Sequence, residues 1–157
     1  MQISKQLSRI SHGLLPLAEL AARLYVAKVF GLAGYSKTRD WDMTLSMFAE
    51  EYRVPFLSDG IADSTSTAIA ASLATGIELM GTTLLVLGLW RKSAASILFA
   101  FNIAAVVSYY HVINEMPVAL NDHLEWGLLL ALLSCLPTQV LSLDALWQKF
   151  KPKRDQV

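Results

Sequence analysis

Charged residues are scarce in this chain of 157 residues, because only 17% are Asp, Glu, Lys or Arg. Soluble domains carry about 25%, and disordered chains carry more. Thirteen basic and thirteen acidic side chains balance to a net charge of zero, which argues against a nucleic-acid partner. The single cysteine, Cys135, excludes both a disulfide framework within the chain and a metal site built from several thiolates.

Hydrophobic residues, by contrast, make up 54% of the chain, and the mean hydropathy is +0.43. A helix that crosses a membrane needs about 20 mainly apolar residues, and four segments reach this length. They predict an all-α fold, a polytopic membrane four-helix bundle in one domain that spans residues 1–157. The expected helices are residues 14–34, 66–89, 93–113 and 118–136. Pro137 is expected to end or kink the last of them.

Basic residues are distributed unevenly between the two sides of this predicted bundle. Eight lysines and arginines lie before the first helix, between the second and third, or after the fourth, whereas three lie in the first loop. The positive-inside rule therefore predicts that both termini are cytoplasmic. We expect a multi-pass protein surrounded by the lipid bilayer.

The long loop after the first helix contains an amphipathic pattern. Its larger apolar residues recur at the spacing of one helical stripe: Trp41, Leu45, Phe48 and Tyr52. Asp40 is a suitable N-cap, and Pro55 ends the pattern. The pattern predicts a short helix over 41–53 that lies on the outer membrane surface or caps the bundle. A solvated connector is the alternative interpretation.

Several polar side chains fall inside the predicted membrane helices, where a charge costs about 2.5–3.5 kcal/mol at the bilayer centre. The expected intramembrane polar cluster consists of Glu19, Arg23, Lys28, Glu78 and Asn102. Arg23 and Glu78 each lie near the middle of their helix, so we expect them to pair, with Glu19 one helical turn from Arg23. Two interpretations stay open: the pair only fixes helix register, or it handles protons or substrate.

A second polar group is expected at the outer mouth of the bundle. Its members lie at predicted helix ends: Lys37, Tyr109, His111, His123 and Glu125. Histidine suits proton transfer because its pKa lies near neutrality, although polar and aromatic residues are also common at any membrane interface. No metal site is predicted, because the chain contains no Glu-x-x-His motif and its histidines lack the spacing of helical ligands.

Three motifs, in the same order along the chain, resemble those of the DoxX family of bacterial membrane proteins. They are Arg23 followed by Gly34-Tyr35-Ser36-Lys37, then Glu78 to Gly81 with Leu84-Leu85, Gly88-Leu89 and Arg91, and finally Ser142-Leu143-Asp144. The chain departs from the family where Leu136-Pro137-Thr138-Gln139 replaces a Gly-x-Gly break. The resemblance implies a four-helix bundle in the bacterial inner membrane.

The same resemblance implies a function. Some relatives resemble membrane subunits of thiosulfate:quinone oxidoreductase, and others are linked to thiol-redox complexes. We therefore expect an inner-membrane component of a quinone- or thiol/sulfur-linked redox system, with quinone as cofactor and a periplasmic or membrane redox partner. As an enzyme, the chain would act as an oxidoreductase subunit. The alternatives are a non-enzymatic scaffold or assembly factor that recruits a partner protein, and a small transporter, which would need a homo-oligomer.

Overall fold

The computed structural model describes residues 2–53, 64–137 and 141–150. This part of the chain forms seven helices and no strand, which confirms the predicted all-α class. In chain order the helices are α1 (Gln2–Arg39), α2 (Trp41–Glu50), α3 (Ser64–Leu87), α4 (Arg91–Ser108), α5 (Tyr110–Ile113), α6 (Pro117–Cys135) and α7 (Leu143–Phe150).

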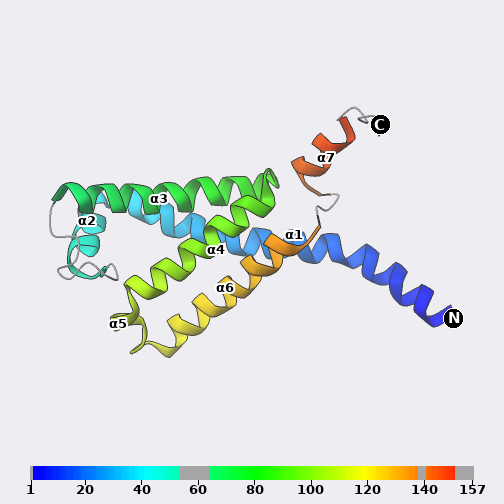
Figure 1. The fold of residues 1–157 in the computed structure, drawn as a ribbon, viewed down its shortest axis with the longest axis horizontal. Coiled ribbons are helices and arrows are strands. Elements are labelled where there is room, and N and C mark those ends of the chain that lie inside the picture. The colour runs from blue at the N-terminus through cyan, green and yellow to red at the C-terminus, as the bar shows by residue number, and fades with distance from the viewer. Residues whose placement is uncertain (1, 54–63, 138–140, 151–157) are drawn as a thin grey trace, which may run out of the picture.

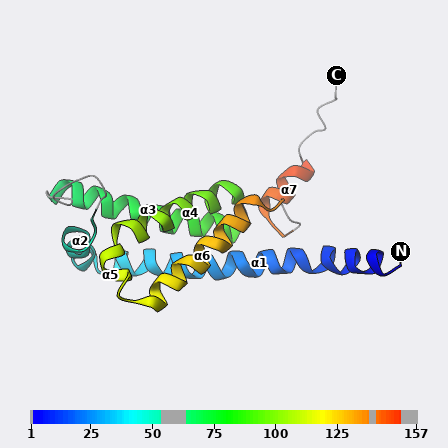
Figure 2. The same cartoon turned by 60° about the horizontal axis from the view of Figure 1, so that its bottom comes forward.

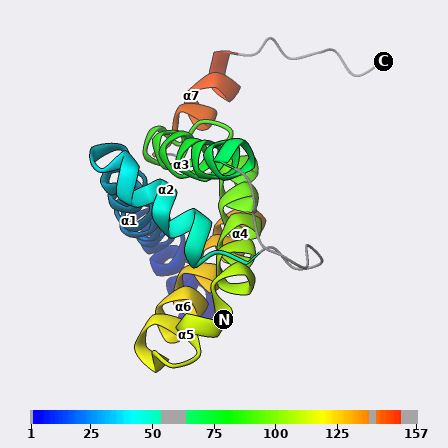
Figure 3. The same cartoon turned by 90° about the vertical axis from the view of Figure 1, so that its left-hand side faces the viewer.

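The four long helices form the body of the molecule, in which α1 packs along α3, and α4 and α6 run together at an angle to them (Figure 1). α1 lies against α3 and α6, and α4 lies against α3 and α6. Viewed from one end, the four helices surround a shared core, and α2 crosses that end (Figure 3). The core contains Val26, Phe30, Leu85, Leu98 and Leu130. The beginning of α1 and the whole of α7 lie at the opposite end (Figure 1).

α1 is much longer than the predicted segment 14–34, and this length changes its register against α3. Its 38 residues span about 57 Å at 1.5 Å per residue, and its first part extends beyond the packed helices (Figure 2). The Thr82 hydroxyl donates to the backbone oxygen of Ala27, which fixes the antiparallel alignment. Arg23 therefore lies beside Gly88 at the end of α3, and not opposite Glu78 as expected.

Among the described helices, α3 is the one whose length and apolar composition suffice to cross a membrane. The other three long helices carry more charged side chains than α3, and polar side chains of α1 and α4 turn inward. Arg23 of α1, Arg91 of α4 and Asn102 of α4 are all buried.

The predicted amphipathic helix is confirmed as α2, although it ends at Glu50. The Asp40 carboxylate accepts a hydrogen bond from the backbone N–H of Met43 at 3.0 Å, as expected of an N-cap. Phe48 is buried against Ala71 and Ala74 of α3, so α2 is a packed part of the bundle and not a solvated connector. The predicted stop, Pro55, lies outside the described residues.

The remaining helix ends differ from the prediction in two places. The third segment, expected to run to residue 113, breaks at Tyr109 and continues as the short helix α5. α7 was not expected. α6 ends at Cys135, two residues before Pro137, as predicted.

Candidate functional site

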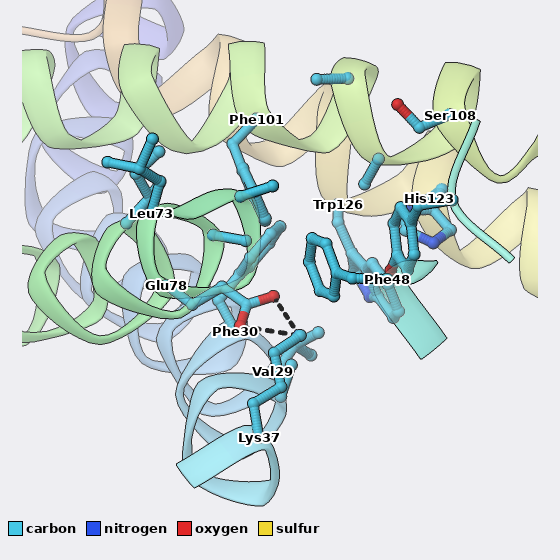
Figure 4. Close-up of a pocket in the computed structure, with 17 residues that line it drawn as sticks. Val29, Phe30, Lys37, Phe48, Leu73, Glu78, Phe101, Ser108, His123 and Trp126 are labelled. Carbon is cyan, nitrogen blue, oxygen red and sulfur yellow. Dashed lines mark hydrogen bonds and ion pairs between the residues drawn. The ribbon is translucent and has the colours of Figure 1, made fainter. Parts of the chain in front are cut away.

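A cavity of about 520 Å³ lies between α1, α3, α4 and α6, under α2. Its walls are mainly apolar, and include Phe30, Phe48, Leu73, Phe101 and Trp126 (Figure 4). Its size is within the range of small-molecule sites, which is about 300–1,000 Å³. A mainly apolar chamber with a few polar groups is typical of small-molecule sites.

A buried ion pair forms one wall of this cavity. The Lys37 ammonium donates to both carboxylate oxygens of Glu78, at 2.7 and 2.8 Å (Figure 4). The Glu78 side chain is 5% exposed and that of Lys37 is 11% exposed. We call these two residues the cavity-side pair. Gly34 makes the pair possible, because a Cβ at this position would lie 3.0 Å from the Cβ of Glu78 and would push α1 away from α3.

His123 of α6 lies on the opposite side of the cavity and is oriented by Asn102 of α4. The Asn102 amide nitrogen donates to the backbone oxygen of His123 at 2.9 Å, so its amide oxygen faces the imidazole. His123 Nδ1 lies 2.8 Å from that oxygen, and we therefore assign the ring proton to Nδ1, which leaves Nε2 unprotonated in the neutral imidazole. The ring also packs edge-on against Trp126.

A second hollow shares His123 with the cavity. It has a volume of about 450 Å³ and lies between α4 and α6. Its lining is almost wholly apolar, and includes the exposed side chains of Ile103, Val107, Leu124 and Leu128. The imidazole thus lies between the cavity and a groove whose apolar side chains reach the molecular surface.

Three stacked aromatic rings join α2 to the end of α4. Tyr52 stacks on Phe48 with ring centroids 4.4 Å apart, and on Tyr109 at 5.3 Å. The Tyr109 hydroxyl donates to the Glu51 carboxylate at 2.6 Å. This hydrogen bond, followed by partial burial, raises the pKa of Tyr109 to about 12. Burial, and then the negative charges of Glu78 and Glu51, raise the pKa of Tyr52.

A second set of buried charges lies at the other end of α3, next to the α3–α4 turn. Glu19, Arg23 and Arg91 are each at most 2% exposed, and we call them the turn-side cluster. Arg91 Nε lies 3.1 Å from a Glu19 carboxylate oxygen, and the nearest Arg23 nitrogen lies 3.8 Å from it. One carboxylate thus faces two guanidinium groups.

The excess positive charge of the turn-side cluster is directed at backbone carbonyls. Arg91 donates to the carbonyls of Leu133 and Leu136, at the C-terminal end of α6. Arg23 donates to the carbonyl of Leu141 at 2.9 Å. The last carbonyls of a helix lack partners within it and carry partial negative charge. Arg91 therefore caps α6 while it stays inside the bundle.

The Ser142-Leu143-Asp144 motif holds the α3–α4 turn from outside. The Asp144 carboxylate accepts hydrogen bonds from the backbone N–H groups of Trp90 and Arg91, at 2.9 and 3.0 Å. Its own N–H donates to the carbonyl of Gly88 at 3.0 Å. Gly88 has a φ of +62°, and a Cβ there would lie 2.6 Å from Ser142 and 2.7 Å from Arg23. Only glycine suits both the backbone and the space.

The structure divides the predicted sites differently from the sequence expectation. The Arg23–Glu78 pair is wrong, because Glu78 binds Lys37 and Arg23 lies with Glu19. Lys28 is exposed on the outward face of α1 and joins neither group. Asn102 is buried, but it binds His123 and not the charged residues.

The residues expected at the outer mouth also separate. Lys37 and His123 line the cavity, and Tyr109 lies next to it through its contact with Tyr52. The His111 ring packs on Tyr109 with centroids 6.0 Å apart, whereas Glu125 is exposed. The expectation of no metal site stays a prediction.

Two features of the site were missed in the sequence. Phe48 and Tyr52 of the amphipathic stripe form cavity wall, which the buried face of that stripe could have indicated. Arg91 falls between the predicted helices 66–89 and 93–113, yet it is the first residue of α4 and is 0% exposed. The adjacent basic residues Arg91 and Lys92 look alike in the sequence, so it could not be predicted that only Lys92 faces outward.

These features define an all-helical protein in which motif residues far apart in the chain meet as buried ion clusters. The family model for DoxX matches residues 18–111, more than half of the chain. The chain therefore belongs to the DoxX family, and is a membrane protein of the DoxX type. No curated protein and no solved structure matches it.

Proposed function

We propose that this protein is an integral component of a membrane redox system, and that it binds a quinone-class molecule in the cavity between Lys37, Glu78 and His123. In this proposal α1, α3, α4 and α6 all cross the bacterial inner membrane, with both termini cytoplasmic. The observation that carries the proposal is the cavity itself: an apolar chamber of about 520 Å³ with a cation on one wall and an imidazole on the other.

The polar groups of the cavity suit the two carbonyl oxygens of a quinone ring. The Lys37 ammonium has three N–H donors, and Glu78 receives its hydrogen bonds at two oxygens. His123 lies across the chamber and, when protonated, donates from Nε2. Phe30, Phe48 and Trp126 supply flat apolar surface for the ring.

Access from the bilayer is supported by the apolar groove between α4 and α6. A hydrocarbon tail bound there would follow exposed aliphatic side chains, and His123 borders both spaces. Reduction of a quinone to its hydroquinone takes two electrons and two protons. A dithiol that is oxidised to a disulfide supplies both, and Lys37 and His123 would pass the protons to the ring oxygens.

Binding can be measured with the full chain in lipid nanodiscs, titrated with a short-chain ubiquinone analogue. Trp126 lines the cavity, so bound quinone should quench its fluorescence. Glu78→Gln leaves the Lys37 ammonium without its anion, and we expect about 10-fold weaker binding or more, since a hydrogen bond to a charged group contributes about 1.5–3 kcal/mol.

Lys28→Gln is the control, because it also removes one charge, but at an exposed position of α1 that does not line the cavity. It should leave quinone binding unchanged. Absence of saturable quenching in the parent protein, or equal binding by the Glu78→Gln variant, would contradict the proposal.

The competing function is a scaffold that recruits a partner protein. The apolar face of α2 packs on α3, so recruitment would have to use its outward side, where Asp42, Met43 and Glu50 are exposed. Under this alternative, Glu78→Gln lowers the folded yield and no quinone binds to the parent protein.

A further inference from the structure

α7 carries an apolar stripe that no other described part of the chain covers. Leu143, Leu146, Trp147 and Phe150 are 40%, 47%, 64% and 84% exposed. They follow the spacing i, i+3, i+4 and i+7, so they share one face of the helix. None of the eight residues of α7 is buried.

This helix is nevertheless held firmly at one end. Asp144 binds the backbone of Gly88, Trp90 and Arg91 through three hydrogen bonds, all between 2.9 and 3.0 Å. From this attachment α7 projects away from the bundle, beyond α3 (Figures 1 and 3). An apolar face held in this position is a built feature of the fold and not a fraying terminus.

Trp90 extends the exposed surface from α7 to the α3–α4 turn. Its side chain is 69% exposed, and its φ of 45° lies in the left-handed region that bulky residues rarely adopt. The Asp144 carboxylate accepts from its N–H and holds it there. A hollow of about 400 Å³ lies between Trp90, Lys92 and Trp147. Tryptophan is enriched where a membrane meets water.

The exposed charges that the structure describes on this surface are basic. Lys92 and Lys149 are exposed on it, and four of the five charged residues from position 149 onward are basic: Lys149, Lys151, Lys153 and Arg154. The one acidic residue of α7, Asp144, is engaged with the turn. Each lysine or arginine near a membrane surface gains about 1 kcal/mol from anionic lipid.

We propose that α7 and Trp90 form an interfacial anchor that lies in the headgroup layer of the bilayer and binds anionic phospholipid. The apolar stripe enters the boundary between headgroups and acyl chains, and the lysines contact the phosphate groups. This inference does not depend on quinone binding. It assigns the exposed apolar face to the lipid surface and not to a partner protein or a second copy of this chain.

Site-directed labelling of the full chain in nanodiscs tests the anchor. In a Cys135→Ser background, a nitroxide label is attached at Leu146→Cys on the apolar stripe, or at Gln148→Cys on the opposite face of α7. The label at 146 should be several-fold more accessible to oxygen, which partitions into lipid, than to a water-soluble nickel chelate. The label at 148 should show the reverse order.

Lipid composition supplies the second readout. Phosphatidylglycerol mixed into phosphatidylcholine should move the 146 label deeper. Lys92→Gln and Lys149→Gln should each lower the preference for the anionic discs about fivefold, the equivalent of one surface charge. Thermal unfolding of each variant checks that the bundle itself is unchanged.

Two results would overturn the anchor. Equal exposure of both labels to the aqueous chelate, in neutral and anionic discs alike, would show that the stripe faces water. Protection of the 146 label from oxygen and chelate together would show that protein covers it, as a partner or a second copy would.

Discussion

The two buried charged sites, about ten residues apart along α3 and hence separated by about 15 Å, differ in what their charges contact. In the turn-side cluster, Arg91 and Arg23 donate to three backbone carbonyls, two at the end of α6 and one just before α7. In the cavity-side pair, Lys37 and Glu78 contact each other and border a chamber. Burial of a charge alone therefore does not identify a functional site. The surrounding space and the identity of the partners decide it.

The largest expected effect comes from breaking the turn-side cluster. Arg91→Ala removes the nearer of the two cations that face Glu19 and leaves the carbonyls of Leu133 and Leu136 without their Arg91 donor. An uncompensated buried charge costs about 3–5 kcal/mol. Thermal unfolding in detergent should show this loss, or folded protein should fail to accumulate.

Lys92→Ala is the matched control for that change, since Lys92 is the exposed neighbour of Arg91. Its free energy of unfolding should stay within about 0.5 kcal/mol of the parent value. Equal losses in the two variants would show that the buried position of Arg91 adds nothing to its contribution to stability.

Apolar replacement of the cavity-side pair gives the sharpest contrast between them. Glu78→Met alone leaves the Lys37 ammonium without its carboxylate partner and should destabilise the fold by about 2 kcal/mol. The double variant Lys37→Met/Glu78→Met should recover that stability, because a buried ion pair can often be exchanged for apolar residues without loss.

Quinone binding should nevertheless be lost in the double variant, which separates a functional pair from a structural one. Chemical denaturation and fluorescence titration on the same samples measure both quantities. A double variant that is as unstable as Glu78→Met would assign the pair to folding alone.

A smaller effect is expected at the motif that clamps the turn. Asp144→Ala removes two hydrogen bonds to the start of α4, and loss of such a cap costs about 1–2 kcal/mol. Gln148→Ala, on the same helix, should be nearly neutral. If both variants unfold together with the parent protein, the clamp contributes nothing to stability.

The smallest expected effect is a pH dependence at Tyr109. The pKa of this residue is about 12 in the folded protein and about 10 in an unfolded chain. The neutral phenol is therefore favoured by folding. Its contribution to stability is complete below pH 10 and is lost between pH 10 and 12.

Tyr109→Phe lacks the hydroxyl and should lack this part of the alkaline loss, while it costs less than about 1 kcal/mol at neutral pH because solvent competes for a partly exposed phenol. Unfolding midpoints of both proteins from pH 8 to 12 test this. Parallel curves over the whole range would contradict it.

Local patterns in the sequence predicted the local structure well. The stripe from Trp41 to Phe48, with Asp40 as its cap, depends only on neighbouring residues and is confirmed as α2. Pro137 likewise marked the end of α6. α7 was missed although its apolar residues follow helical spacing, because the helix has only eight residues and its position depends on the contact between Asp144 and the α3–α4 turn.

The pairing of charges could not be predicted, because it depends on the register between helices. If the first two helices covered only the predicted residues 14–34 and 66–89, Arg23 would lie opposite Glu78. Instead, α1 continues as one helix to Arg39. This shifts Lys37 into the position next to Glu78 and brings Arg23 to Gly88. The sequence alone identified Arg23 and Glu78 as ionisable residues inside apolar helices. Their partners could be identified only from the three-dimensional alignment of the helices.

The donor network of Arg91 has a consequence for biogenesis. Translation produces Glu19 and Arg91 well before the carbonyls at Leu133 and Leu136 exist, and Asp144 leaves the ribosome last of these groups. The half-made chain therefore holds Glu19 and Arg91 before the acceptors that Arg91 finds at the end of α6 have been made. The donor network of Arg91 and the contact of Asp144 with the α3–α4 turn are therefore completed only after α6 and the start of α7 have been made.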